Sequence, residues 1–99
     1  MNTKTEILDF LHANRHLLLT KYHVTKIALF GSFARNEQTS SSDVDLLIEL
    51  KEDTKNIYDI KSTLKEYLSK SFERSVDLAR EKYLKPYAKE QILKDALFV

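Results

Sequence analysis

The sequence predicts an α/β fold in which a single mixed β-sheet is covered by helices. Apolar residues recur at helical spacing over residues 4–20 and 56–72. Three shorter segments, residues 24–30, 44–50 and 75–79, are rich in the apolar and β-branched residues that strands favour. Helical and strand segments alternate along the chain, and this alternation favours one sheet with helices packed on it.

The first predicted helix begins with a capping signal. Thr3 and Glu6 have the spacing of a capping box, in which a Thr hydroxyl and a Glu carboxylate satisfy the first free amides of a helix. The apolar pattern that follows predicts a helix over residues 4–20. Residues 24–30 (VTKIALF) then form a predicted buried strand, which stops at Gly31.

The middle of the chain is expected to alternate between helix and strand. Residues 32–36 are predicted to form a short helical turn that leads into the polar loop 37–42. Residues 44–50 (VDLLIEL) are almost continuously apolar, which is typical of an interior strand. The segment 56–72 has apolar residues three or four apart and predicts an amphipathic helix. Residues 75–79 (SVDLA) are the third predicted strand.

A last helix is predicted to begin at Pro86, because proline is favoured in the first turn of a helix. We expect this helix to bury Ile92 and Leu93, with Leu97 as a further candidate. The predicted order is helix, strand, short helix, strand, helix, strand, helix. Since 99 residues are too few to build a second hydrophobic core, residues 1–99 are interpreted as one domain.

Composition and charge argue against several classes of site. The 16 Lys and Arg against 15 Asp and Glu give a formal charge of +1, without the basic excess of a surface that binds nucleic acid through its phosphates. No direct polynucleotide binding is therefore expected. The absence of cysteine excludes disulfides, thiolate metal sites and a cysteine nucleophile. The sequence has neither an apolar run near the ~20 residues that cross a bilayer nor a signal peptide, so we expect a cytoplasmic protein without membrane contact.

Gly31 is the single glycine of the chain, and it directly follows a predicted strand. A missing Cβ lets a ligand approach the backbone, and phosphates bind where amides are free at a strand-to-helix turn. The Ser32 hydroxyl can donate to a phosphate oxygen, and Arg35 can add a charged fork. The alternative is a glycine needed only for a tight turn, since the segment lacks the glycines and the lysine of a Walker loop.

Three aspartates are predicted to form a metal site. Residues two apart in a strand point to the same face, so Asp43 and Asp45 project together, about 6.5–7 Å apart along the chain. Two such carboxylates repel each other unless a cation lies between them. Oxygen ligands without nearby His or Cys suit magnesium, with manganese as the alternative ion. Asp77 would add a third carboxylate for two ions if its strand lies beside the second. The competing interpretation is a solvated strand start, with Asp77 in a salt bridge.

The segment 31–50, GSFARNEQTSSSDVDLLIEL, resembles the nucleotidyltransferase signature of the DNA polymerase beta-like superfamily. More closely, it is similar to the minimal nucleotidyltransferase (MNT) branch, which comprises little besides the catalytic domain. The length of the chain and the later segments 75–78 (SVDL) and 84–87 (LKPY) resemble that branch too. The resemblance implies the polymerase beta-like palm fold.

The resemblance also implies a role for each residue of the signature. Asp43 and Asp45 would bind both magnesium ions, and Asp77, as the third carboxylate, would orient or deprotonate the attacking hydroxyl. The triphosphate of ATP would be bound by Gly31, Ser32, Arg35 and Ser42. Asn36 stands where the family usually has glycine, and asparagine is the non-glycine residue that best tolerates positive φ.

Members of the MNT branch often act as the antitoxin to a HEPN-domain RNase toxin and transfer AMP to a toxin tyrosine. The resemblance therefore implies an enzyme, a protein adenylyltransferase, with ATP as its substrate and a HEPN-domain toxin as its partner. The small neutral domain also lacks the extra subdomains with which polymerases hold a strand, and this favours a protein acceptor. The alternatives are an antitoxin that acts by binding alone and a transferase that modifies a small hydroxyl compound such as an antibiotic.

Overall fold

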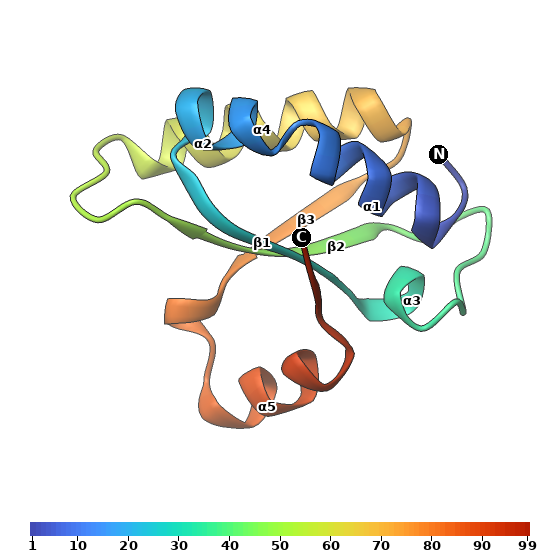
Figure 1. Ribbon diagram of the computed structural model, residues 1–99. Helices are drawn as coiled ribbons and strands as arrows, with labels where there is room; N and C mark the ends of the chain where they lie inside the picture. The colour runs from blue at the N-terminus through green and yellow to red at the C-terminus, as the bar shows by residue number, and fades with distance from the viewer.

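The computed structural model describes all 99 residues, and they form three layers (Figure 1). One face of the sheet is covered by α1 (Lys4–Ala13), α2 (Arg15–Tyr22) and α4 (Ile57–Phe72). The opposite face is covered by the 3₁₀ helix η1 (Glu81–Tyr83) and by α5 (Pro86–Asp95). The predicted α/β class is confirmed.

The sheet has four strands in the order β3-β2-β1-β4. Their bounds are β1 (Val24–Phe30), β2 (Val44–Leu50), β3 (Val76–Arg80) and β4 (Leu97–Phe98). β1 runs antiparallel to β2 and β4, whereas β2 and β3 are parallel, so the sheet is mixed as predicted. A parallel pair needs a long crossover connection, and α4 supplies it.

The hydrophobic core lies between the sheet and the layer of α1, α2 and α4. It is one cluster of 16 buried residues. β2 contributes its even-numbered residues from Val44 to Leu50 to this cluster. Side chains alternate along a strand, so the odd-numbered residues from Asp45 to Glu49 point to the opposite face. We name the two sides the core face and the site face.

The N-terminal helix is broken at Asn14, so the prediction of one continuous helix was wrong. Asn14 Nδ2 donates to the carbonyl of Phe10 at 2.8 Å, and a side chain that binds the backbone in this way competes with the helix. The break lets each half bury its own apolar residues against the core: Ile7 and Leu11 from α1, Leu18 and Tyr22 from α2.

The predicted capping box starts α1. Thr3 Oγ1 accepts a hydrogen bond from the backbone N–H of Glu6 at 3.1 Å. The Glu6 carboxylate accepts from the N–H of Asn2 at 3.2 Å, and this hydrogen bond is the main reason that the pKa of Glu6 is lowered. The carboxylate thus binds the amide one residue before the N-cap Thr3, and the two hydrogen bonds together fix where the first helix begins.

The C-terminal helix α5 begins at Pro86 as predicted, but it buries none of its residues. Leu93 is 37% exposed, and Ile92 is only half-buried. Leu97 lies outside the helix, in the short strand β4, where it pairs with Leu29 of β1. The expectation that this helix buries Ile92 and Leu93 was wrong, because α5 lies on the outside of the site face, in a layer that it shares only with η1.

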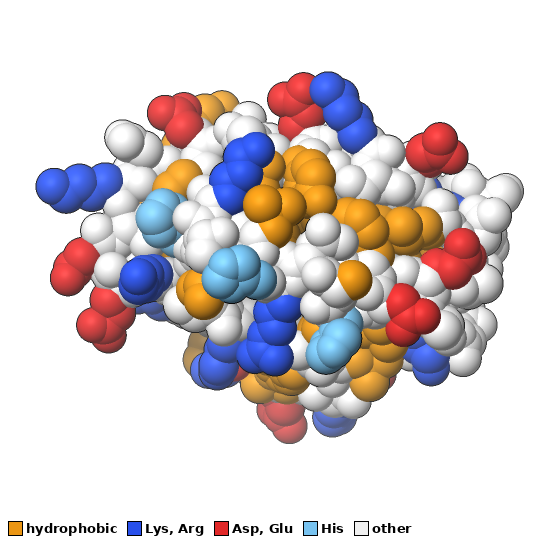
Figure 2. All heavy atoms as spheres, turned by 45° about the horizontal axis from the view of Figure 1, so that its top comes forward, with side chains coloured by type: hydrophobic (Ala, Val, Ile, Leu, Met, Phe, Trp, Pro, Cys, Tyr) orange, Lys and Arg blue, Asp and Glu red, His pale blue; other side chains and the backbone are white.

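The outer surface of the helical layer exposes apolar side chains. Figure 2 shows hydrophobic atoms on this side of the molecule, lying among basic and histidine side chains. Leu17 and Leu19 of α2 and Tyr58 of α4 are the large exposed hydrophobic residues of this layer. None of the helices has the length and apolar character that crossing a bilayer requires.

Candidate active site

The segments of the predicted site meet at one end of the sheet. Phe30 pairs with Asp45 across β1 and β2, and Asp45 pairs with Asp77 across β2 and β3. These residues therefore form one row across three strands, with neighbouring strands about 4.8 Å apart. Gly31 follows Phe30 and lies against Asp45, so a Cβ built on Gly31 would collide with Asp45 Oδ2 and lie 3.1 Å from its Cγ.

All three predicted carboxylates lie at this end of the site face. Asp43 is exposed and precedes β2 by one residue, two positions before Asp45. Asp77 is exposed within β3. No ion pair within the chain neutralises any of the three, so the salt bridge that would have made Asp77 a structural residue is not formed. Their oxygens remain free to bind a ligand.

Asp45 is the carboxylate that the charges of the other two affect. Burial raises the pKa of Asp45 above its ordinary value, and the negative charges of Asp77 and then Asp43 raise that pKa further. Arg35 opposes this by lowering the pKa. Like charges gathered in this way destabilise the ionised carboxylates and favour the binding of a cation.

The donor set fits a hard divalent cation. It consists of carboxylate oxygens alone, the ligands that magnesium and manganese prefer. As they stand, no three His, Cys, Asp or Glu side chains of the chain are arranged to hold a metal ion.

The glycine turn has the backbone geometry that the sequence suggested. Gly31 has φ +76°, a left-handed conformation that side chains disfavour, and it begins the short helix α3 (Gly31–Ala34). The first amides of a helix have no partner within it, and Ser32 is half-buried beside them. Asn36 has φ 58°, so the residue in place of the family glycine keeps a glycine-like conformation.

Arg35 and Ser42 bind other parts of the chain. Arg35 Nε donates to Glu37 Oε1 at 2.8 Å, and Nη1 donates to Asp95 Oδ2 of α5 at 3.0 Å. These hydrogen bonds, with Asp95 first, raise the pKa of Arg35. Ser42 Oγ accepts from the N–H of Thr39 at 2.8 Å and so closes the loop before Asp43.

Sequence reasoning missed two residues that bind the site segments. Asp95 lies 60 residues from Arg35 in the chain, and no local sequence pattern predicts that the two side chains pair. Arg74 donates to three carbonyl groups of the loop before Asp43: those of Thr39, Ser40 and Ser42. Its position just before the segment of Asp77 was the only signal available.

Comparison with known proteins assigns the family. The profile described as "Nucleotidyltransferase domain" matches residues 13–99. The chain belongs to this family. The match includes the glycine turn and all three carboxylates, and it extends to the last residue.

Relatives and a solved structure agree with this assignment over the length of the chain. A candidate protein adenylyltransferase of Methanocaldococcus jannaschii is 40% identical over 100 residues, with full coverage of both chains. The protein adenylyltransferase MntA of Thermococcus cleftensis is 32% identical over 99 residues, covering 100% of this chain and 98% of the relative. A solved structure of a candidate minimal nucleotidyltransferase superposes with a TM-score of 0.72 at 31% identity, covering 91% of this chain and 93% of that one. The fold is that of a minimal nucleotidyltransferase.

A more distant solved structure has the same fold. It is a complex of a tri-AMPylated HEPN toxin of Shewanella oneidensis with an MNT antitoxin. The TM-score is 0.58 at 19% identity, with 96% of this chain and 66% of that chain covered. At this identity the likeness shows the fold alone.

Proposed function

We propose that this nucleotidyltransferase is an antitoxin that transfers AMP from ATP to a tyrosine hydroxyl of a cognate HEPN-domain toxin, with magnesium as cofactor. The transfer would take place in the cytoplasm and would neutralise the toxin. The observation that carries the proposal is the row formed by Phe30, Asp45 and Asp77. It places the Gly31 turn beside a cluster of carboxylates that no cation of the chain neutralises.

In the proposed reaction the acceptor oxygen attacks the α-phosphorus of ATP, and the bond to the β-phosphate breaks. Pyrophosphate leaves, and the acceptor proton passes to the Asp77 carboxylate or to water. Magnesium, when bound by Asp43 and Asp45, would lower the pKa of the acceptor oxygen and neutralise charge on the phosphates. The residues of the chain supply alignment.

The phosphates would lie against the Gly31 turn, where no Cβ blocks their approach to the backbone. The Ser32 hydroxyl would donate to one phosphate oxygen. Arg35 would form a second charged contact, and phosphate oxygens would compete with Asp95 for its guanidinium. Ser42 would act through the loop that it closes, by holding Asp43 near the triphosphate.

The choice of a protein acceptor is supported by the relatives and by the surface. Two full-length relatives are named as protein adenylyltransferases, one of them as a candidate. The chain has a net charge of only +1, which is poor for binding a long polyanion. The HEPN partner is proposed from the AMPylated toxin complex with the same fold.

The test is to incubate the protein with magnesium, ATP and a HEPN-domain protein encoded beside it, and then to measure intact mass. We expect the partner to gain adenylate, and peptide mapping to place it on tyrosine. Asp43→Ala should abolish the gain, and Lys65→Ala, an exposed change on α4 at the opposite side of the sheet, should not alter it.

Two outcomes would contradict the proposal. Neutralisation of the toxin that persists in Asp43→Ala, without any mass gain in the wild type, would favour an antitoxin that acts by binding alone. Adenylate found on a small hydroxyl compound, and not on the partner protein, would favour the small-molecule transferase.

A further inference from the structure

Arg74 lies where the three segments of the site come together. It follows α4 by two residues and precedes the strand that carries Asp77. Its guanidinium donates hydrogen bonds, at 2.8 to 3.2 Å, to oxygen atoms of five residues: Met1, Asn2, Thr39, Ser40 and Ser42. An exposed arginine that served only solubility would not be bound by so many partners.

The contacts of Arg74 reach each part of the site. Nη1 donates to the carbonyl oxygen of Ser42 at 3.0 Å, one residue before Asp43. The guanidinium also lies over the ring of Phe33 at 5.0 Å, and Phe33 belongs to the short helix that begins at Gly31. Arg74 also lies two residues before β3, the strand that carries Asp77.

The residues around Arg74, apart from the loop 37–42, are held by packing and by backbone hydrogen bonds. Phe33 is fully buried in the core, so the aromatic surface under the guanidinium cannot easily move. The N–H of Val44 donates to the carbonyl of Ser75 at 2.9 Å, which ties the start of β2 to the start of β3. The loop 37–42 consists of polar residues, four of which are exposed: Glu37, Thr39, Ser40 and Ser41. Glu37 and Gln38 bind Ser32 and Asn2 at the start of this loop, and Arg74 binds its second half, which leads to Asp43.

We propose that Arg74 is a positioning residue for nucleotidyl transfer, which sets the place of Asp43 relative to the Gly31 turn and to Asp77. This inference rests on the proposed function. Among the basic side chains, only the planar guanidinium of arginine can donate hydrogen bonds to several carbonyl groups and stack on an aromatic ring at the same time. A lysine in its place keeps the charge but loses most of these directed hydrogen bonds.

Arg80 provides a matched control at the other end of β3. Its Nη2 donates to Glu49 Oε1 at 3.1 Å, and its guanidinium lies 4.9 Å from the ring centre of Tyr83. It resembles Arg74 in having a carboxylate or carbonyl partner and an aromatic neighbour. Its hydrogen bonds lie at the far end of β2 and β3 from Asp45 and Asp77, and its side chain has no hydrogen bond to the Gly31 turn or to the loop 37–42.

The first measurement is hydrogen exchange on the free protein, which needs neither nucleotide nor partner. Arg74→Lys should speed exchange of the amides from Thr39 to Val44 by about 10-fold or more, because opening of the loop then costs less. Exchange in α4 should stay as in the wild type, and Arg80→Lys should leave the loop amides unchanged. Unchanged exchange of the loop in Arg74→Lys would overturn the proposal.

The second measurement is AMP transfer. Arg74→Lys should lower kcat by about 10- to 100-fold, as expected for displaced catalytic groups, with a smaller change in the KM for ATP. Arg80→Lys should transfer within about twofold of the wild type, as expected of a change that leaves the catalytic geometry intact. Wild-type kcat in an Arg74→Lys variant whose loop exchanges faster would also overturn the proposal. If the wild type itself shows no transfer, the proposed function fails, and the exchange result still decides whether Arg74 orders the loop.

Discussion

The two faces of the sheet are built in opposite ways. On the core face, 16 buried residues form one apolar cluster under α1, α2 and α4. On the site face, Ala28 and Leu47 are buried, but α5 above them buries nothing of its own. Two ion pairs link this second layer to the rest of the chain, Arg35 with Asp95 and Lys26 with Glu81, and a third, Lys89 with Glu81, lies within the layer.

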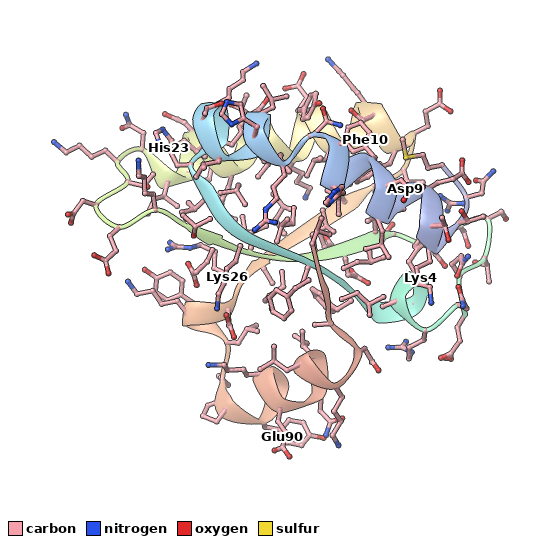
Figure 3. The ribbon with its side chains drawn as sticks, viewed as in Figure 1. Lys4, Asp9, Phe10, His23, Lys26 and Glu90 are labelled. Carbon is pink, nitrogen blue, oxygen red and sulfur yellow. The ribbon has the colours of Figure 1, made fainter.

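Figure 3 shows this arrangement for two labelled residues. Lys26 projects from β1 toward the layer of η1 and α5, whereas Glu90 lies on the outer side of α5. Lys26 Nζ is 3.8 Å from Glu81 Oε2 in η1. Glu49 is also held there: burial alone would raise its pKa, but hydrogen bonds from the N–H of Lys82 and from Arg80 lower it. The comparison indicates that packing on the core face supplies most of the stability. The site face can therefore carry three neighbouring carboxylates, although they repel each other.

The largest expected effect tests where the stability lies. Leu68 of α4 is fully buried in the core cluster, so Leu68→Ala should lower the free energy of unfolding by about 3 kcal/mol. Ile92→Ala in α5 should lower it by less than about 1 kcal/mol, because that side chain is only half-buried. Urea denaturation of both variants measures the contrast. Equal losses would show that the site face contributes as much packing as the core face.

A smaller effect is expected at the glycine turn. Gly31→Ala places a Cβ against Asp45 at φ +76°, which should cost about 1–2 kcal/mol of unfolding free energy. AMP transfer should fall more steeply than stability, because both the turn and the carboxylate are displaced. Asn36→Gly is the control in the same loop, since its φ of 58° suits glycine, and it should keep both activity and stability. A fully active Gly31→Ala enzyme would contradict the placement of phosphates at this turn.

The smallest effect concerns the charge of Asp45. Its raised pKa means that the folded state binds the proton more tightly than the unfolded chain does. This contribution to stability is present below the ordinary aspartate pKa and is lost as pH rises through the raised pKa. Asp45→Asn should therefore stabilise the protein at pH 7 by less than about 1 kcal/mol, because water screens the half-exposed carboxylate.

Thermal melting across pH checks this sign. The advantage of Asp45→Asn should shrink as pH falls into the ordinary carboxyl range, where Asp45 of the wild type becomes neutral too. Magnesium should raise the melting temperature of the wild type and have less effect on the variant. A variant that is less stable than the wild type at neutral pH without magnesium would show that Asp45 stabilises the fold.

The site was more predictable from sequence than the elements around it. Alternation along a strand, a local property, placed Asp43 and Asp45 on one face, whereas the meeting of Asp77 with Asp45 depended on β3 lying beside β2, which the sequence analysis left as a condition. The break at Asn14 depends on one side-chain hydrogen bond, which apolar spacing does not reveal. β4 has two residues, too few for a strand pattern, and forms because the edge of β1 is available to Leu97.

Long-range polar contacts were beyond the reach of local patterns. The partners of Arg74 lie more than 30 residues away in the chain, and Asp95 lies 60 residues from Arg35. α5 has apolar residues at helical spacing, yet its isoleucine and leucine remain partly exposed, although Ala28 and Leu47 of the sheet beneath it are buried. Such pairings follow from the assembled fold and not from the segments alone.

The central claim is that the end of the site face at Gly31 binds a nucleoside triphosphate through cations held by Asp43, Asp45 and Asp77. The most direct test is a crystal structure with magnesium and a non-hydrolysable ATP analogue. The account predicts metal ions between the Asp43 and Asp45 carboxylates and the phosphates, with Asp77 turned toward the same ions. A nucleotide bound elsewhere, or Asp77 directed away from the phosphates, would contradict it.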